Sequence, residues 1–484
     1  MNKKSILLAA LVAVFAVLTA FCSGRALGSA DDISFTLETV YGDPSAIEGL
    51  EIHDIITALH DGPYAYAKVN TVWTSSVRIE NGRPVTVDSV VSGAEAGDLQ
   101  PTVYRNCQGY RISAVFDAGD QNEMRYNSHM EDLVKDVDYP PDAKAPLKIQ
   151  LSQLCDHYPY SLDVVLPEGF KVTEDDIRDF LKIPVLDEQQ VWLMLKAGPN
   201  SDTLWGSYRP SDGEGFALRT FGGMYKGDYL FTFCNKTYSG ANVDCSQIPL
   251  GYGIYRLSED GTFSLFKRLD EADTIVHFGV SLDESRMFLH RVRDGRYVVE
   301  VLDAKSLEVI SSLDLREYDW SGEIKARVFE GRESETVAFV RDHSWDAQWD
   351  TDRVYLITDD AAHDLRVAAL NAVRDGIIIN SFCPSVYSAS SAGGKTVIVS
   401  RACYVHYSKE SGGEHSIYGE DLRSSVMIHV AGPEGTVYAG ILRSSLDDGQ
   451  QTRRCGIGPF YTKDMVIYGG YYNEINAGRM YALW

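Results

Sequence analysis

The amino-acid sequence predicts an all-β protein. Short runs of alternating or continuous apolar residues recur along the chain, pairs of turn residues separate many of them, and a single segment carries clear helix signals. In the second half the runs come in groups of four, and four short antiparallel strands make one blade of a β-propeller. These observations predict one propeller over residues 31–484, with about seven four-stranded blades and with six or eight as alternatives.

The first residues are expected to form an export segment. Lys3 and Lys4 precede a run of 17 residues, 6–22, that contains no charge. A basic start followed by an apolar run is typical of a secretory signal peptide, and this run is only slightly shorter than the ~20 residues of a spanning helix. Small residues favour cleavage after Ala30; without cleavage, residues 1–30 stay as an N-terminal membrane anchor.

A third alternative is a lipid anchor on Cys22, which ends the apolar run. Phe21 disfavours it, because lipoprotein signals carry a small residue at that position. In all three cases one export event places the following residues outside the cytoplasm, since no second long apolar run follows. The expected localisation is extracytoplasmic, either secreted or anchored to the cytoplasmic membrane.

The exported body is strongly acidic. Residues 31–484 contain 42 basic and 69 acidic residues, a net charge of −27. Such a charge argues against nucleic acid as a partner, because phosphates are neutralised by Lys and Arg. It argues equally against binding of an anionic membrane surface, except through the N-terminal segment. A soluble body that repels other copies is the simplest interpretation.

The first half carries one strong hairpin signal. Residues 33–37 alternate apolar and polar side chains, which predicts a strand. Further along, Asn81-Gly82 separates two β-branched runs and predicts a type I′ hairpin, in which Pro84 indicates an edge strand.

The helix signal lies in residues 31–185, which fit the blade pattern least well. Thr173 is a good N-cap, three acids follow it, and Pro184 ends a short helix that is expected to lie outside the sheets. A smaller propeller preceded by a separate β subdomain over residues 31–185 is therefore the alternative domain organisation.

The second half is more regular. Residues 252–257 and 263–268 are two expected strands, and Asp294-Gly295 marks a tight turn within the unit that follows. Three successive units of four expected strands are 275–280, 286–291, 297–302 and 307–313; then 324–329, 336–340, 353–358 and 365–370; then 377–380, 395–400, 425–430 and 436–442.

One stretch carries a resemblance to known proteins. Residues 297–309 read Tyr-Val-Val-Glu-Val-Leu-Asp-Ala-Lys-Ser-Leu-Glu-Val, an apolar strand, a turn of Asp and small polar residues, and a second strand. This resembles a blade of the WD40/YVTN-like β-propeller superfamily, supported by the looser strand rhythm over about residues 186–484. The Gly-His and Trp-Asp pairs of standard WD40 repeats are absent. The resemblance implies a shape used for binding, scaffolding and several unrelated catalyses, and identifies no specific family.

The end of the chain suggests how the ring closes. Residues 455–460, 464–469 and 479–483 are three expected strands with no fourth. We expect residues 33–40 to supply the missing strand, because pairing the first and last strands removes an exposed sheet edge.

Seven cysteines follow the export segment, and none forms a Cys-x-x-Cys pair or has a His at metal-ligand spacing. We therefore expect no zinc or other metal site. Cys234 and Cys245 bracket a polar loop and are the best candidate disulfide in an oxidising compartment, with Cys383 and Cys403 second. If the host forms few disulfides, all seven are small buried hydrophobic residues.

A cluster of acidic and aromatic residues is the candidate binding loop. Its members are Trp345, Asp346, Trp349, Asp350 and Asp352. Aromatic side chains at a loop tip bind sugars or peptides by stacking and contact area. The alternatives are packing of the tryptophans between blades and a solvated acidic loop. Calcium is disfavoured, because the ligand spacing of an EF-hand is absent.

No motif indicates catalysis or a cofactor. The nucleophile elbow, the phosphate-binding loops and the His-Glu-x-x-His pattern are all absent. The leading hypothesis is a non-enzymatic binding or scaffold protein that holds a peptide, protein or glycan. The alternatives are an extracellular carbohydrate hydrolase or lyase, and a membrane-anchored sensor. Carboxylate pairs in the central channel would favour the enzyme, whereas an apolar or Ser/Thr-lined channel would favour binding.

Overall fold

The computed structural model describes most of the strands and their turns. The described residues are 34–61, 67–93, 111–115, 147–158, 161–185, 190–197, 202–208, 218–236, 242–281, 283–317, 326–330, 336–340, 353–365, 372–374, 377–379, 386–392, 394–406, 420–445, 452–454 and 481–483. The predicted export segment, residues 1–30, lies outside them. In these ranges no helix has the length and apolar character that crossing a membrane requires.

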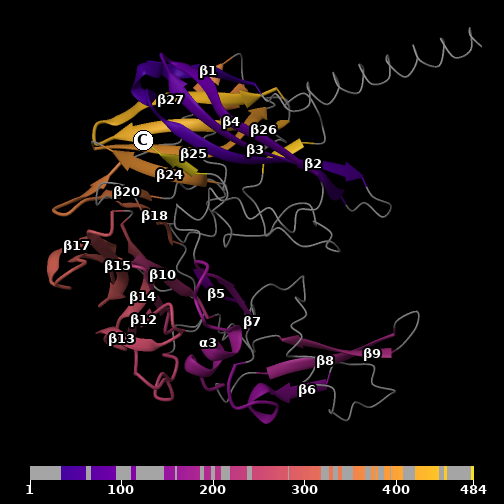
Figure 1. Cartoon of the computed structure of the whole chain (residues 1–484), viewed down its shortest axis with the longest axis vertical. Helices are drawn as coiled ribbons and strands as arrows, with labels where there is room; N and C mark the ends of the chain where they lie inside the picture. The colour runs from indigo at the N-terminus through magenta and orange to yellow at the C-terminus, as the bar shows by residue number, and fades with distance from the viewer. Residues whose placement is uncertain are drawn as a thin grey trace, which may run out of the picture. The chain divides into compact units, whose positions relative to one another are not determined.

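The chain divides into two compact units (Figure 1). The terminal unit comprises residues 1–104 and 367–484, and so contains both ends of the chain; the middle unit comprises residues 105–366. In both units the described secondary structure consists mainly of antiparallel sheets, as the sequence predicts.

Three four-stranded antiparallel sheets make up much of the middle unit, each built from four strands that are consecutive in the sequence. The first contains β10 (Thr220–Tyr225), β11 (Asp228–Phe233), β12 (Gly253–Leu257) and β13 (Phe263–Arg268). The second contains β14 (Thr274–Val280), β15 (Arg286–Arg293), β16 (Arg296–Asp303) and β17 (Val309–Glu317). The third contains β18 (Ala326–Glu330), β19 (Thr336–Val340), β20 (Arg353–Ile357) and β21 (Ala362–Asp364).

The first strands of these sheets lie next to one another. β10 lies beside β14 and β14 beside β18, while β5 (Arg111–Val115) lies on the other side of β10. Gly223 of β10 allows this approach, because a side chain there would press against Val280 of β14. Four-stranded sheets that meet along their first strands are consistent with successive blades of a β-propeller.

The β14–β17 sheet has a hydrophobic core on each face. On one face Phe278 and Leu289 pack with side chains of the β10–β13 sheet. On the other face Phe288 and Val299 pack with Tyr355 and other side chains of the β18–β21 sheet. Each fully buried large apolar side chain contributes roughly 1.5–3 kcal/mol, so the stacking of these sheets is a main source of the unit's stability.

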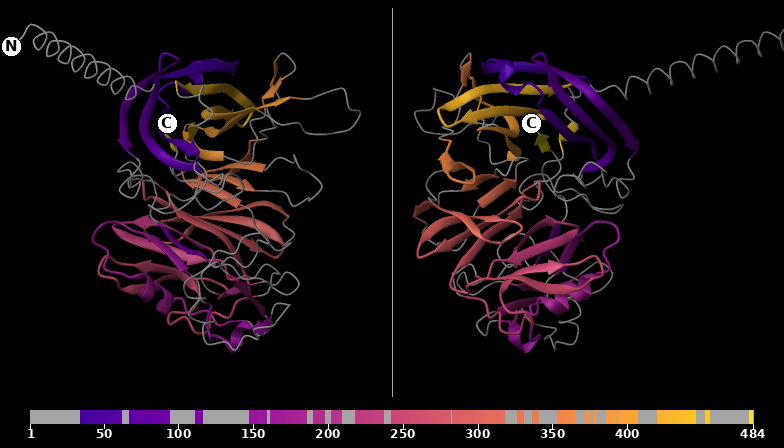
Figure 2. Two further views of the ribbon diagram at one scale, coloured as in Figure 1. Left: turned by 90° about the vertical axis from the view of Figure 1, so that its right-hand side faces the viewer. Right: turned by 60° about the vertical axis from the view of Figure 1, so that its left-hand side comes forward.

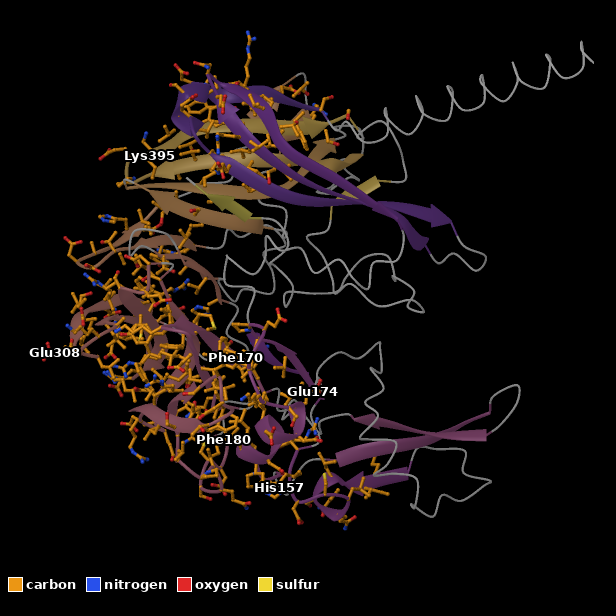
Figure 3. All side chains as sticks on the ribbon, in the orientation of Figure 1. His157, Phe170, Glu174, Phe180, Glu308 and Lys395 are labelled. Atoms are coloured by element: carbon orange, nitrogen blue, oxygen red, sulfur yellow. The ribbon has the colours of Figure 1, made fainter. Side chains whose placement is uncertain are left out.

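The helix α3 (Glu174–Phe180) begins where the sequence predicts. The side chain of Thr173 accepts a hydrogen bond from the backbone N–H of Asp176, whose carboxylate accepts one from the backbone N–H of Thr173. Phe180 stacks on Phe263 of β13 with ring centroids 4.3 Å apart, so the helix packs on the outer strands of a sheet (Figure 3).

The remaining described elements of the middle unit are shorter sheets. β5 pairs with β7 (Ser161–Val165), and β8 (Gln190–Ala197) pairs with β6 (Leu147–Gln150) and β9 (Asp202–Tyr208). A turn of 3-10 helix, Leu151–Gln153, follows β6.

The terminal unit contains two larger sheets. In the first, the strand order is β1 (Phe35–Gly42), β27 (Gly435–Ser444), β26 (Glu420–Gly432), β25 (Lys395–His406), β23 (Ile377–Ile379) and β22 (Ala372–Arg374), and β24 (Val386–Ala392) also pairs with β25. In the second, the order is β28 (Thr452–Arg454), β2 (Glu51–Asp61), β3 (Ala67–Glu80) and β4 (Arg83–Gly93), and β29 (Tyr481–Leu483) also pairs with β2. One hydrophobic core joins side chains of both sheets.

Strands from the two ends of the chain pair in this unit, although not with the predicted partners (Figure 2). The prediction joined residues 33–40 to the strand near 479–483. In the structure β1 pairs with β27, where Leu37 lies opposite Leu442, and β29 pairs with β2. The ion pair between Arg443 and Glu38, at 2.9 Å, contributes to this choice of partner.

Both predicted tight turns are confirmed. Asn81 and Gly82 have φ of 51° and 68°, and Asp294 and Gly295 have φ of 49° and 71°, as a type I′ turn requires at both central positions. β4, which contains Pro84, is the end strand of its sheet, as predicted.

Two strands differ from the prediction. The last strand of the β18–β21 sheet is Ala362–Asp364, because backbone and hydroxyl hydrogen bonds between Thr358 and Ala361 turn the chain back at once. Of the predicted strand 365–370, Leu365 lies outside a strand and residues 366–370 are outside the described residues. β24 was not expected, because its sequence Val-Tyr-Ser-Ala-Ser-Ser-Ala is rich in small polar residues and carries a weak apolar signal.

Candidate functional site

The predicted binding loop cannot be placed. Trp345, Asp346, Trp349, Asp350 and Asp352 all belong to the segment between β19 and β20 that is outside the described residues. The described polar groups with the most specific geometry lie instead in and around the β14–β17 sheet.

Cys234 and Cys245 are both buried and are free thiols in this structure. The loop between them is closed by a hydrogen bond of 2.9 Å from the Val243 N–H to the Asn235 carbonyl. Burial raises the pKa of Cys245 to about 12 and also raises that of Cys234. Thiols with raised pKa values are poor nucleophiles, so neither cysteine is suited to catalysis.

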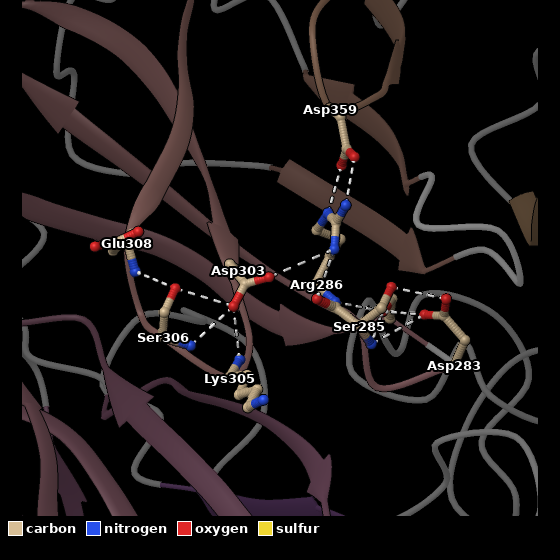
Figure 4. A network of polar contacts seen from close by, with 9 residues as sticks. Asp283, Ser285, Arg286, Asp303, Lys305, Ser306, Glu308 and Asp359 are labelled. Carbon is tan, nitrogen blue, oxygen red and sulfur yellow. Dashed lines mark hydrogen bonds and ion pairs between the residues drawn. The ribbon is translucent and has the colours of Figure 1, made fainter.

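A polar network links the β14–β17 and β18–β21 sheets (Figure 4). Arg286 donates two hydrogen bonds of 2.7 Å to the carboxylate of Asp359, and its Nη1 also lies 3.9 Å from Asp303. This bidentate pair raises the pKa of Arg286. Asp283 accepts hydrogen bonds from the Ser285 backbone and hydroxyl and from the Ser281 hydroxyl, which holds the turn before Arg286 in place.

The stretch that resembles a WD40/YVTN-like blade contributes to the same network. Asp303 accepts hydrogen bonds from the backbone N–H groups of Lys305 and Ser306 and from the Ser306 hydroxyl, at 2.8–3.1 Å. The Asp-Ala-Lys-Ser segment is therefore a side-chain-capped turn between β16 and β17. The structure of this turn explains its polar residues, and no bound ligand is needed to explain them.

A second ion network has three nearly buried members, Arg291, Asp273 and Glu300, and one exposed member, Arg293. Arg291 donates to Asp273 at 2.7 Å and also pairs with Glu300, and Arg293 donates two hydrogen bonds of 2.9 Å to Asp273. Burial lowers the pKa of Arg291, while Asp273 acts in the opposite direction. The two carboxylates and two guanidinium groups balance in charge, and Arg291 pairs with both acids.

The first strands of the β10–β13 and β14–β17 sheets carry apolar and aromatic residues together with a histidine. β10 reads Thr-Phe-Gly-Gly-Met-Tyr and β14 reads Thr-Ile-Val-His-Phe-Gly-Val, so neither strand contains a carboxylate. His277 of β14 is half-buried, and its ring centroid lies 5.6 Å from that of Phe221 of β10. All residues of β14 except His277 are buried, and four of the six residues of β10 are half-buried.

A second histidine lies next to His277 on the neighbouring strand. His290 of β15 is opposite it in the strand register, is fully buried, and has its ring centroid 5.4 Å from that of His277. Its Nδ1 is 3.0 Å from the Tyr297 hydroxyl, and its Nε2 is buried without a hydrogen-bond partner. Burial, and secondarily His277, lowers the pKa of His290 well below its usual value, so the ring is neutral.

Sequence reasoning did not identify this histidine pair. A β-bulge between Ile275 and His277 shifts the register by one residue; without it His277 would lie opposite Leu289. The signal that could have been noticed is a histidine at equivalent depth in two adjacent predicted strands. Among the described residues there is no group of three or more His, Cys, Asp or Glu side chains that could hold a metal ion.

No protein-family model matches the chain, and no curated protein matches it. Parts of the chain are similar to solved structures. One is the β-propeller domain of Cps50 (Swd1) from Myceliophteria thermophila, with 8% identity, a TM-score of 0.19, and coverage of 53% of this chain and 79% of that one. Another is an oligogalacturonate lyase from Vibrio parahaemolyticus, with 7% identity, a TM-score of 0.22, and coverage of 51% and 72%.

A third similar structure is the uncharacterized protein lmo1340 from Listeria monocytogenes, with 9% identity and a TM-score of 0.20. The match covers 45% of this chain and spans 56% of the Listeria protein. At such identities and scores these likenesses carry no information about activity or ligand.

Proposed function

We propose that the protein is an exported, non-enzymatic binding or scaffold protein that holds a peptide, protein or glycan on one face of a closed β-propeller. The observation that carries this proposal is the residue content of β10 and β14, the strands along which two of the sheets meet: neither contains a carboxylate. A central channel lined by such strands would bind by contact rather than by acid–base chemistry.

The buried acids support the same proposal. A carbohydrate hydrolase needs two carboxylates about 5–10 Å apart that face the substrate. Asp273 and Glu300 are close enough, but both bind Arg291 inside the sheet stack. Both side chains are buried and held in ion pairs, so they do not face a substrate.

Ring closure and export are parts of this proposal. Pairing of β1 with β27 and of β29 with β2 supports a ring in which the chain ends meet, with about seven blades. The apolar run behind Lys3 and Lys4 supports export.

A reporter fusion tests the localisation. An enzyme that is active only outside the cytoplasm, fused after Trp484, should be active in the native host. The matched control deletes residues 6–22 and should be silent. Activity of a cytoplasmic reporter in the full-length fusion would show that the body is not exported, and sequencing the mature N-terminus would separate a cleaved signal from a retained anchor.

Affinity capture tests the binding function. Full-length protein, immobilised through its C-terminus, should retain one protein or polysaccharide from host envelope fractions in a saturable manner and without turnover. A double variant of the predicted loop, Trp345→Ala with Trp349→Ala, should lose this retention. The exposed Tyr41 provides the matched control, since Tyr41→Ala removes an aromatic side chain elsewhere. Release of reducing sugar from the captured material would overturn the proposal in favour of a carbohydrate hydrolase.

A further inference from the structure

We propose that His277 and His290 form a binding site for a first-row transition-metal ion. The two residues are a directly opposed cross-strand pair, and their rings meet edge to face, with an interplanar angle of 86°. Imidazole nitrogen is a preferred ligand of zinc, nickel and copper, so two adjacent imidazoles favour that class of ion over calcium or magnesium.

The ring separation fits simultaneous ligation. Zinc binds histidine nitrogen at about 2.0–2.1 Å, which places the centroids of two tetrahedrally arranged imidazoles roughly 5 Å apart. The observed separation is 5.4 Å. The distance between the two rings is therefore close to that of two imidazoles on one ion.

The hydrogen bonding of His290 matches that of a metal ligand. Ligating histidines bind the ion through one ring nitrogen and hydrogen-bond through the other. In His290 the Tyr297 hydroxyl, 3.0 Å from Nδ1, occupies one nitrogen, and the other, Nε2, is buried without a partner. A buried polar atom with no partner destabilises the fold, and an ion at Nε2 would supply the missing contact.

The overall charge of the chain also favours occupancy. A net charge of −24 raises the concentration of cations near the surface.

His277 is the more exposed member of the pair. It is half-buried on β14 beside Phe221, whereas His290 is fully buried. A histidine has two ring nitrogens, so His277 can keep one contact and ligate through the other. Two protein ligands leave coordination positions for water or for a donor group of a bound partner.

Zinc titration of the full-length protein, purified in mild detergent and stripped with a chelator, tests this site. Isothermal titration should detect one zinc ion bound per wild-type chain. His277→Ala should lower the affinity for this ion at least about tenfold. Tyr297→Phe should weaken binding by roughly tenfold, because it removes the hydroxyl that orients His290. Zinc should raise the unfolding midpoint of the wild type and not that of His277→Ala.

His429→Gln is the matched control, because His429 is also buried with an unpartnered ring nitrogen. It should bind zinc as the wild type does. Since His277 is half-buried, its substitution should preserve the fold, which circular dichroism verifies. Zinc affinity and stoichiometry that are equal in wild type and His277→Ala, or no binding by the wild type at millimolar zinc, would overturn the proposal.

Discussion

Arg291 is the side chain on which the buried polar interior of the β14–β17 sheet depends. It bridges Asp273 and Glu300 in a place where water cannot replace either partner. Breaking a buried pair leaves an uncompensated charge, which is far more costly than losing a surface pair.

Asp273→Asn should therefore destabilise the protein by roughly 3–5 kcal/mol. The control is Asp314→Asn, whose partner Arg296 is exposed, and which should cost less than about 1 kcal/mol. Urea unfolding followed by tryptophan fluorescence measures both. Equal effects of the two substitutions would show that the Asp273 network contributes no more than a surface pair.

His429 should make stability depend on pH. Burial lowers its pKa to about 4, below the value of about 6.5 expected in the unfolded chain. The unfolded chain binds the proton more tightly than the folded one. The contribution of neutral His429 to the free energy of unfolding is therefore complete above about pH 6.5 and is lost as pH falls toward 4. Between pH 7.5 and 4.5 the wild type should lose about 2–3 kcal/mol more than His429→Gln in paired urea titrations. Parallel losses in both proteins would contradict the assignment.

Cys234 and Cys245 remain a predicted disulfide in the exported protein. The hydrogen bond between Asn235 and Val243 holds together the ends of the loop that the two cysteines bracket. Intact-mass measurement after alkylation without reduction should show both thiols protected in exported protein and both modified in cytoplasmically expressed protein. Alkylation of both in the exported form would remove the disulfide from consideration.

At the scale of elements, the sequence-based predictions were most accurate for features that have a local cause. The capping box of α3 and the positive φ angles of Asn81-Gly82 and Asp294-Gly295 follow from a few adjacent residues. Strand partners were predicted less well. β1 was expected beside the last strand and pairs with β27, because its partner is chosen by side chains about four hundred positions away.

The docking of β1 can be tested within one strand. Phe35 is buried in the core of the terminal unit, whereas Tyr41 of the same strand is 52% exposed. Phe35→Ala should cost about 3–5 kcal/mol, and Tyr41→Ala less than about 1 kcal/mol, in urea unfolding. A small effect of Phe35→Ala would mean that β1 contributes little to the stability of its unit.

At the scale of the whole molecule, charge sets the expected partners. With a net charge of −24 the full chain should not retain duplex DNA at about 150 mM salt, since few phosphates can be neutralised. A gel-shift titration with a basic protein of similar size as the positive control measures this. Saturable binding that weakens steeply with salt would reveal a basic patch that the overall charge conceals.

The sequence by itself determined the all-β class, the tight turns, the short helix and most strands of the β14–β17 sheet. Each of these depends on side-chain alternation, on residues that tolerate positive φ, or on a helix cap, all of which act over a few positions. The four strands expected at 275–280, 286–291, 297–302 and 307–313 accordingly match β14 to β17 closely.

Only the tertiary structure decided which residues meet. A single bulge places His277 opposite His290, the stacking of two sheets buries Arg291 with its acids, and β27 rather than the last strand receives β1. Alternation reveals which face a side chain occupies, but the partner across the ladder depends on register, and one inserted residue changes it.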